Sequence, residues 1–221
     1  MLPRLQMPKK DNIFYIAKSE GGINPCVPRP AGSPLRFANC VFYALGRFAE
    51  LWGFWLPSSN AEDIAAHAAA AGLTVDSDPV PGALIVWRAG KLQQGSDGAG
   101  HVAVVEMVGD KSIVTSESGW HAKQEYWTTT RLPQDGWGAA AGTAFIGFVH
   151  PPDPLKKGSK GPQVSDLQRR LAAAGYLRAS EVDGDFGRIT LGAVLAYQLE
   201  HKLQVDGIAG PATRTTLAKE G

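Results

Sequence analysis

The chain has few cysteines and no long apolar run, and both absences narrow what it can be. Its 221 residues contain two cysteines, Cys26 and Cys40, too few for a disulfide framework or a four-cysteine zinc site. The two could pair, or one could be structural and the other reactive. No apolar stretch is long enough to span a membrane, and residues 1–22 lack the apolar segment of a signal peptide. We therefore expect cytoplasmic synthesis without a signal peptide, and no membrane insertion.

An excess of charge of one sign is also missing. The 22 Lys and Arg residues and the 21 Asp and Glu residues leave a net charge of +1. Such a balance gives no reason to expect nucleic acid or an acidic membrane as a partner. With 44% hydrophobic and 19% charged residues, the composition is that of a globular protein, and we expect a monomer.

The predicted elements fall into two regions, the first of which changes from helices to strands. Residues 1–38 are punctuated by Pro and Gly and predict an ordered loop. Helical spacing of apolar residues follows, with breaks at "LPSSN" and Gly72, and Asn60 is the expected cap of the second helix. Short β-branched runs separated by turns then predict a mainly antiparallel sheet. The predicted fold class is α+β, with helices over residues 40–52 and 61–72 and strands over 80–88, 101–109, 112–118, 125–131 and 143–150.

The second region is helical and follows a linker-like segment. Residues 150–161, "HPPDPLKKGSKG", combine prolines, lysines and glycines without periodicity, which is typical of a linker. Beyond it, apolar residues recur at helical spacing and predict three short helices. We therefore predict a domain over residues 1–150, a linker over 151–160 and an all-α domain over 161–221.

An internal repeat lies in this second region. Residues 182–190, "VDGDFGRIT", align with residues 205–213, "VDGIAGPAT", with Val, Asp, both Gly and Thr at the same offsets. Each copy predicts a tight turn that leads into a helix. Its acids lie in turns and His201 is isolated in the sequence, so we expect no catalysis in this region.

Cys40 lies where the irregular segment gives way to a helix. Asn39 is a good N-cap, which places Cys40 in the first turn of the helix, where the helix dipole favours a negative charge. A thiol in that position ionises more readily, and the thiolate is the nucleophilic form. Free cysteines are nevertheless among the most buried residues, so this stretch alone favours a small buried cysteine.

A base and an orienting residue follow Cys40 along the chain. His101 opens a predicted strand directly after a Gly-rich loop, and Glu117 ends the next strand. The order of nucleophile, base and polar orienter follows the logic of papain-like hydrolases. Glu117 could equally be a solvent-facing acid. Three further histidines compete as the base: His67 in a helix, His121 in a loop and His150 at the linker.

Five stretches of the first region together resemble the CHAP family of cysteine, histidine-dependent amidohydrolases/peptidases. They are "NCVFYALGR", "PGALIVWR", "GHVAVVEMV", "IVTSESGW" and "FIGFVH", and the likeness spans roughly residues 20–150. It implies a papain-like fold with Cys40 as nucleophile, His101 as general base and Glu117 as the third polar residue. The backbone N–H of Cys40 would belong to the oxyanion hole, with Asn39 and Tyr43 as candidates to complete it.

Two departures from the family pattern bear on metals and on the site. Some members carry a calcium loop of alternating Asp residues before the nucleophile, but "NPCVPRPAGSPLRFANC" contains no Asp or Glu. Calcium prefers carboxylate and carbonyl oxygens, so we predict no metal here and no cofactor. Gly119 replaces the Asn often found two residues after the orienting Glu.

The second region resembles the small three-helix peptidoglycan-binding domain. The stretches "GPQVSDLQRRLAAAGYL", "VDGDFGRITLGAVLAYQ" and "LQVDGIAGPATRTTL" match it. Together the two likenesses imply a bacteriophage endolysin that is made in the host cytoplasm and acts on bacterial peptidoglycan. It would be an amidase or endopeptidase acting on stem or cross-bridge peptides, and it would need a separate release factor such as a holin. A bacterial autolysin, a secreted effector and an inactive wall-binding protein with a structural Cys40 stay open as alternatives.

Overall fold

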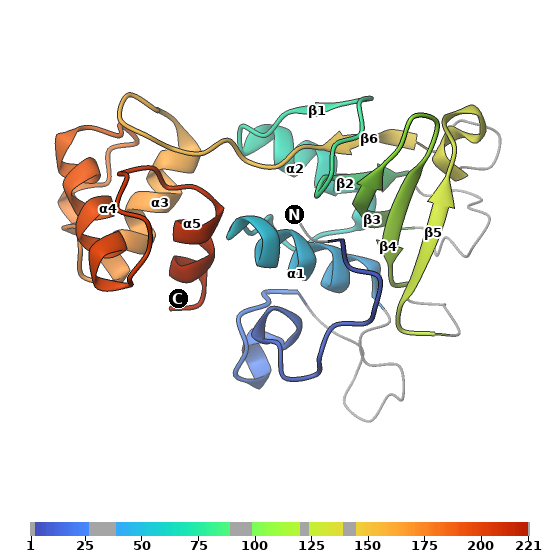
Figure 1. Ribbon diagram of the computed structural model, residues 1–221, viewed down its shortest axis with the longest axis horizontal. Helices are drawn as coiled ribbons and strands as arrows, with labels where there is room; N and C mark the ends of the chain where they lie inside the picture. The colour runs from blue at the N-terminus through green and yellow to red at the C-terminus, as the bar shows by residue number, and fades with distance from the viewer. Residues whose placement is uncertain (1–2, 27–38, 89–98, 120–123, 139–144, 221) are drawn as a thin grey trace. The chain divides into compact units, whose positions relative to one another are not determined.

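The structure, a computed structural model, describes residues 3–26, 39–88, 99–119, 124–138 and 145–220 (Figure 1). The chain forms two compact units. One comprises Met1–Phe48 and Trp55–Pro151, and the other comprises Ala49–Phe54 and Pro152–Gly221. Strands occur in the first unit, while helices α3, α4 and α5 belong to the second. The predicted α+β fold class is confirmed.

The first unit contains a six-stranded sheet in which all pairs are antiparallel. Its spatial order is β1-β6-β2-β3-β4-β5. Every predicted strand is present, and β1 is an additional pairing too short for a pattern to reveal. The strands are β1 (Val75–Asp76), β2 (Leu84–Trp87), β3 (His101–Val108), β4 (Ile113–Glu117), β5 (Trp127–Arg131) and β6 (Phe145–Val149).

Two helical segments precede the sheet, and their starts differ in how they are capped. Helix α1 (Cys40–Trp52) begins as predicted, because the Asn39 side chain accepts hydrogen bonds from the backbone N–H groups of Val41 and Phe42, at 3.0 and 3.2 Å. The predicted cap by Asn60 is wrong, since its side chain makes no capping bond. A 3-10 turn, η3 (Ala61–Asp63), leads instead into α2 (Ile64–Ala70).

Further short 3-10 segments lie in the described part of this unit, two of them in the irregular N-terminal stretch. They are η1 (Ile13–Tyr15), η2 (Lys18–Glu20) and the kinked η4 (Pro133–Gly138). Asn24 fastens the first of them to α1, because its buried Nδ2 donates to the carbonyls of Phe14 and Phe42. None of the helices in the described ranges is both long and apolar enough to cross a membrane.

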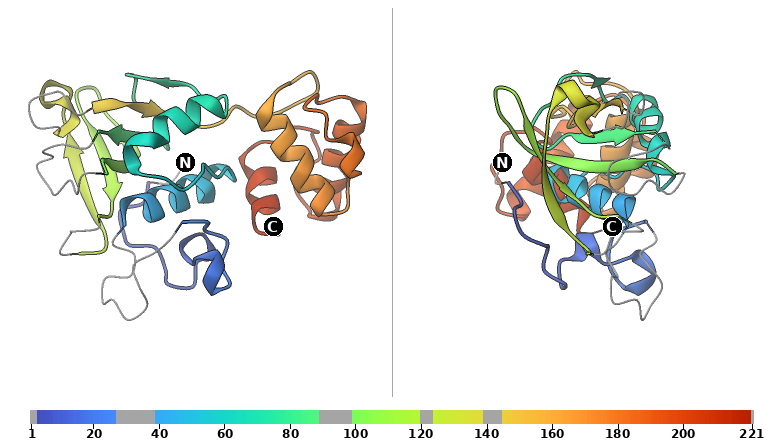
Figure 2. Two further views of the ribbon diagram at one scale, coloured as in Figure 1. Left: turned by 180° about the vertical axis from the view of Figure 1, so that it is seen from behind. Right: turned by 90° about the vertical axis from the view of Figure 1, so that its right-hand side faces the viewer.

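The sheet is covered on two faces, with α1 and η4 on opposite sides (Figure 2). Strand residues alternate between the faces, and the residues facing η4 form a compact apolar cluster against Trp137. The cluster consists of Ala83, Ile85, Trp87, Ala103, Val105, Ile113 and Phe148.

A buried ion pair fixes α1 against the sheet. Arg47 of α1 donates through Nε and Nη2 to the two carboxylate oxygens of Glu106, at 3.1 and 3.0 Å. The register of β3 against β4 shifts between Val105 and Met107, and such a bulge re-aims the side chain between them. Ser116 also donates to Glu106, at 2.7 Å, and the Tyr43 hydroxyl donates to Ser116, at 2.8 Å. The helix is therefore held in one register relative to β3 and β4.

The second unit has three α-helices around one apolar core: α3 (Pro162–Ala173), α4 (Arg188–Glu200) and α5 (Pro211–Ala218). A 3-10 turn, η6 (Ala179–Glu181), lies between the first two. Part of the segment with linker-like composition packs with this unit. Leu155 is buried in the core and pairs with Ala209, while the backbone of residues 158–161 bonds to Gly184 and Phe186 or bridges to Asp185.

The first copy of the internal repeat is organised by one buried glutamine. Gln168 of α3 is fully buried, and its Oε1 accepts from the backbone N–H groups of Asp183 and Gly184. Its Nε2 donates to Asp183 Oδ1, the Asp185 carbonyl and Thr190 Oγ1, at 2.8, 3.1 and 2.9 Å. Every polar position of that side-chain amide is therefore used to hold the turn.

The second copy repeats the arrangement with Gln198 of α4. Its Oε1 accepts from the backbone N–H groups of Asp206 and Gly207. Its Nε2 donates to Asp206 Oδ1, the Ile208 carbonyl and Thr213 Oγ1, at 2.9, 3.0 and 3.1 Å. The repeated Asp, Gly and Thr residues thus make turns and helix starts, as their sequence pattern indicates.

His201, at the end of α4, is not isolated, contrary to the sequence-based expectation. Its ring stacks on Tyr197 with centroids 3.9 Å apart, and its Nδ1 donates to the Tyr197 carbonyl. Its Nε2 lies 2.7 Å from Glu220. The histidine therefore joins the end of α4 to the residues after α5.

Candidate active site

Strand register places the predicted base and its orienting residue on one face of the sheet. Directly paired residues share a face, as do residues two apart on a strand. Trp87 pairs with His101, and Val105, four residues after His101, pairs with Thr115. Glu117 follows Thr115 at the next position on that face and pairs with Trp127. Sequence distance hides this proximity, which antiparallel pairing creates.

The three predicted catalytic residues are brought together. The His101 Nε2 atom lies 3.0 Å from Glu117 Oε2, and the Cys40 thiol is within hydrogen-bonding reach of the same imidazole ring. Because Nε2 is bonded to Glu117, the ring nitrogen left for Cys40 is Nδ1. Cys40 is the first residue of α1 and His101 the first of β3, so the contact joins a helix start to a strand start.

Burial deepens from the thiol to the carboxylate: Cys40 is 9% exposed, His101 5% and Glu117 1%. Burial alone disfavours the charged forms of His101 and Glu117, but their contacts with each other and with neighbouring groups outweigh this effect. Against burial, the His101 hydrogen bond and the charges of Arg131 and His101 lower the pKa of Glu117 to about 2. Likewise, contacts with Cys40 and Glu117 raise the pKa of His101 to about 9 despite its burial. At neutral pH the ring therefore carries two protons and faces a carboxylate.

Arg131 was not predicted from the sequence, and it is the second partner of Glu117. Its Nη2 lies 2.6 and 2.8 Å from the two carboxylate oxygens, and its Nε lies 2.9 Å from Oε1. Its Nη1 donates to the Trp137 carbonyl of η4, at 2.8 Å, and its guanidinium lies 4.5 Å from the Trp87 ring centroid. Its position at the end of the run "WTTTR" looks like an exposed strand end. Only the pairing of β5 with β4, which places Arg131 opposite Ile113 and on the same face as Glu117, could have revealed it.

Two tryptophans flank the His101 ring. Trp87 lies 5.5 Å from it, centroid to centroid, at an interplanar angle of 28°, and Trp127 lies 6.5 Å away at 6°. Aromatic neighbours restrict the orientations that a ring can adopt, so His101 is held edge-on between Cys40 and Glu117. The buried Trp127 Nε1–H has no hydrogen-bond partner within the described ranges.

The predicted oxyanion residues differ in what their polar groups contact. Asn39 Oδ1 caps α1, and the Asn39 backbone N–H donates to Ser118 Oγ at 3.2 Å. The Tyr43 hydroxyl donates to Ser116, and its burial raises the pKa of Tyr43 well above the ordinary value despite that hydrogen bond. Its proton is therefore committed to the ion-pair network under α1. The backbone N–H of Cys40 lies in the first turn of α1, where a helix leaves its N–H groups without an intrahelical partner, and its place in an oxyanion hole stays a prediction.

The competing candidates lie in other surroundings. His67 is in α2 and its Nδ1 has no partner within the described part of the chain. His150 bonds to Asp76 Oδ1 at 2.8 Å, and His121 lies outside the described residues. Cys26 is a buried free thiol whose burial raises its pKa to about 11, as a structural cysteine would show.

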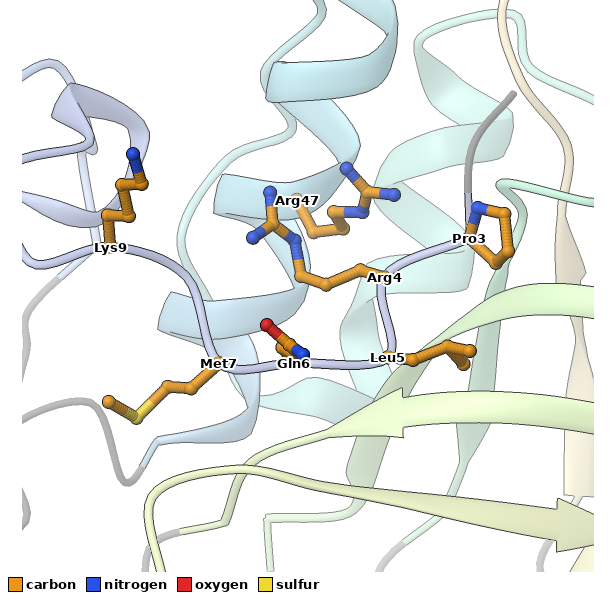
Figure 3. A pocket seen from close by; sticks show the side chains of 7 residues that line it. All are labelled: Pro3, Arg4, Leu5, Gln6, Met7, Lys9 and Arg47. Carbon is orange, nitrogen blue, oxygen red and sulfur yellow. The ribbon is translucent and has the colours of Figure 1, made fainter.

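No metal cluster accompanies these residues in the described part of the chain, and the cavity lies elsewhere. The described residues contain no group of three or more His, Cys, Asp or Glu that could hold a metal ion, and residues 27–38 of the segment that lacks carboxylates lie outside them. A cavity of about 490 Å³ is lined by residues 3–7, Lys9 and Arg47 (Figure 3). None of Cys40, His101 and Glu117 lines it.

Comparison with known proteins assigns both regions. Residues 30–119 match the CHAP domain, and residues 160–217 match the peptidoglycan-binding domain. Over 68 residues the chain is 48% identical to N-acetylmuramoyl-L-alanine amidase CwlL of Bacillus licheniformis, which covers 30% of the chain and 19% of that protein. Over 57 residues it is 44% identical to N-acetylmuramoyl-L-alanine amidase CwlM of Mycobacterium tuberculosis, covering 26% and 14%.

Among solved structures, an N-acetylmuramoyl-L-alanine amidase from Staphylococcus aureus is 28% identical with a TM-score of 0.36, over 50% of this chain and 30% of that one. The chain spans less than a quarter of each of the two curated relatives. The two family matches follow each other along the chain in the same order as the α+β and the helical regions of the structure. The chain contains a CHAP domain followed by a peptidoglycan-binding domain.

Proposed function

We propose that the protein is a peptidoglycan hydrolase that cleaves an amide bond through Cys40. The observation that carries the proposal is the contact of the Cys40 thiol and Glu117 with the same His101 ring, within the segment that matches the CHAP domain. A thiol, an imidazole and a carboxylate in that order make up the nucleophile, base and orienter of cysteine-dependent acyl transfer.

Each proposed step uses one of these groups. The His101 ring, doubly protonated at neutral pH, holds the proton that the Cys40 thiol gives up, and the thiolate sulfur attacks the amide carbonyl to form a C–S bond. The carbonyl oxygen becomes an oxyanion facing the Cys40 backbone N–H. His101 then protonates the amine as the C–N bond breaks, which leaves a thioester. Water attacks the thioester with His101 as base, the C–S bond breaks, and the carboxylic acid and free thiol are released.

Residues 160–217 would hold the enzyme on its polymeric substrate. The match to a peptidoglycan-binding domain supports this assignment. Tethering a catalytic unit to a binding unit raises its effective concentration at the polymer without any new contact to the scissile bond. Loss of the second unit should therefore matter most at low enzyme concentration and least for short soluble peptides.

Clearing of purified bacterial cell walls tests the proposal. The wild-type protein should lower the turbidity of the suspension, and Cys40→Ala should not. Cys26→Ala is the matched control, because it removes the other thiol and should clear walls like the wild type. Equal clearing by the wild type and Cys40→Ala would rule out Cys40 as the nucleophile.

The bond that is cut distinguishes an amidase from an endopeptidase. We propose cleavage in the stem or cross-bridge peptide, either at the bond to the N-terminal L-Ala of the stem or at a peptide bond further along. Mass spectrometry of the soluble fragments separates the two. A new N-terminal Ala identifies an amidase, whereas a new N-terminus on a cross-bridge residue identifies an endopeptidase.

For its biological setting, we propose a bacteriophage endolysin released by a holin, since the chemistry serves lysis of the wall. The same two domains would suit a bacterial autolysin or a secreted effector. Expression in a susceptible bacterium, with and without a pore-forming holin, separates these settings. An endolysin should lyse cells only when the holin is present, and lysis without it would contradict the endolysin assignment.

A further inference from the structure

We propose that Arg131 is a positioning residue of the active site, which keeps Glu117 charged and aligned toward His101. The inference rests on the proposed function in one respect, that Cys40 and His101 are the reacting pair. Arg131, on β5, would then be the fourth residue of the site, after Cys40 on α1, His101 on β3 and Glu117 on β4.

The geometry of the carboxylate is the first step of the argument. Arg131 contacts both oxygens of Glu117, whereas His101 contacts Oε2 alone. Two parallel contacts from a planar guanidinium fix the rotation of a carboxylate, which a single hydrogen bond does not. With the plane fixed, Oε2 stays directed at His101 Nε2, and Nδ1 on the other side of the ring stays directed at Cys40.

Arg131 is itself held in place from three sides. Its Nη1 donates to the Trp137 carbonyl, its plane lies over the Trp87 ring, and its Nε lies 3.2 Å from Thr115 Oγ1. A side chain at Gly138 would collide with Arg131 Nη1, so the glycine that ends η4 leaves room for the guanidinium. These contacts use the fork and the flat face of arginine, which lysine lacks.

The charge balance is the second step. Glu117 is almost completely buried and would be costly to ionise alone. The polar groups that contact Glu117 are His101 from β3, Thr115 from its own strand and Arg131 from β5. The segment η4 contributes indirectly, since its Trp137 carbonyl accepts a hydrogen bond from Arg131. The nearest acid of η4, Asp135, is exposed and accepts from Gly138. Arg131 is therefore the permanent cation of this group.

Removal of that cation should reach Cys40 through His101. Without Arg131, Glu117 becomes easier to protonate, and a neutral carboxyl group stabilises a protonated His101 much less. The imidazolium in turn stabilises the thiolate that reacts. Loss of Arg131 should therefore move the acid-side inflection of thiol reactivity to higher pH, which a purely structural residue would not do.

The experiment measures the rate of Cys40 alkylation by iodoacetamide against pH, in the full chain carrying Cys26→Ala. We expect Arg131→Met to move the acid-side inflection upward by about one pH unit or more, which is about tenfold in rate on that limb. Arg131→Lys keeps the charge without the fork and should shift it less. Thr130→Val, on the exposed side of the same strand, is the matched control and should leave the profile unchanged.

A double-mutant cycle separates positioning from stability. In a Glu117→Gln background, Arg131→Met should cause no further shift of the inflection, because the charge that it supports is gone. An unchanged inflection in Arg131→Met, with or without a lower melting temperature by circular dichroism, would overturn the proposal.

Alkylation also keeps this inference separate from the proposed function. If walls are not cleared but the inflection shifts, the hydrolase proposal fails and the positioning of Glu117 by Arg131 stands. If walls are cleared through Cys40 but the inflection does not move, the hydrolase proposal stands and the positioning role of Arg131 fails.

Discussion

Glu117 in the first unit and Gln168 in the second are each a buried polar side chain that organises its surroundings. Both have almost no exposed surface, and each is contacted by several polar partners. Glu117 collects a histidine, a threonine and an arginine from three strands. Gln168 collects backbone N–H groups, a carbonyl, a carboxylate and a hydroxyl from a single turn.

The difference is the charge. An amide both donates and accepts and carries no charge, so Gln168 needs no counter-ion, although the Asp183 carboxylate is one of its acceptors. A buried carboxylate only accepts, and it needs cations to remain ionised. The second unit repeats at Gln198 an arrangement around a neutral amide that holds an exposed Asp in a turn, whereas the first builds an arrangement around a buried charge beside a thiol. The amides fix the shape of two turns, while the buried carboxylate raises the pKa of the histidine that contacts the thiol.

Removal of the charge from Glu117 should have the largest effect. Glu117→Gln keeps the size of the side chain but leaves His101 and Arg131 without a carboxylate. We expect kcat/KM for wall hydrolysis to fall by about 10²–10⁴-fold, the range for loss of positioned acid–base catalysis. Near-ultraviolet circular dichroism should show that the fold persists. Activity within a few-fold of wild type would mean that Glu117 does not orient His101.

Replacement of the glutamines tests the other half of the comparison. Gln168→Leu leaves the backbone N–H groups of Asp183 and Gly184 without their acceptor, and a buried polar group without a partner costs about 1–3 kcal/mol, an upper limit for these part-buried groups. We expect faster amide hydrogen exchange in peptides of the second unit, measured by mass spectrometry, and unchanged exchange in β2 to β4. Gln198→Leu should give a similar result because its contacts are equivalent.

The control for these two variants is Gln163→Leu in α3. Equal exchange rates in Gln168→Leu and in this control would show that the buried amide does not stabilise the turn.

The two units should also differ in how pH affects their stability. The folded-state pKa of His101, about 9, lies above its ordinary value of 6.5. Its contribution to stability is therefore fully present below pH 6.5 and is lost as pH rises through 9. Glu117, with a pKa of about 2 against 4.5, stabilises the fold above pH 4.5 and loses that effect as pH falls through 2.

Hydrogen exchange at several pH values, corrected for intrinsic rates, measures this difference. Between pH 6.5 and 9, protection of β3 and β4 should decrease, whereas protection of α3 and α4 should stay constant. A parallel decrease in both units would show that the titration is not specific to the charged network.

The smallest effect is expected at a surface ion pair of the second unit. Lys160 Nζ lies 2.6 Å from Asp185 Oδ2, with 72% and 45% of the two side chains exposed. Exposed pairs contribute little to stability because water and salt screen them. Lys160→Met should leave the thermal midpoint of the second unit unchanged in calorimetry, and a clear decrease would show that this pair supports the turn as the buried glutamine does.

Much of the fold could be predicted from local patterns. The cap at Asn39, helix α1 and five of the six strands follow from capping residues and periodicity, which act over a few positions. Strand β1 was not predicted, because a strand of two residues is too short to show an alternating pattern. The cap at Asn60 failed because a 3-10 turn begins there instead of an α-helix.

The site could be predicted only in part. The order of Cys40, His101 and Glu117 is visible along the chain, and the structure brings the three together, although their catalytic use stays a prediction. Arg131 depends on the register between β4 and β5, which the sequence does not state. The roles of the two glutamines were not predicted for a related reason. Gln168 precedes the Asp that it contacts by 15 residues and Gln198 precedes its Asp by 8, so an alignment of the two repeats does not place the glutamines opposite each other.

The two tryptophans beside His101 have a further use. Protonated imidazole quenches indole fluorescence, and the ring centroids of Trp87 and Trp127 lie 5.5 and 6.5 Å from that of His101. The residues after 151 contain no tryptophan, so that segment adds no indole emission to the signal. Intrinsic fluorescence should therefore brighten as His101 loses its proton, which would give an optical readout of the protonation state of this histidine.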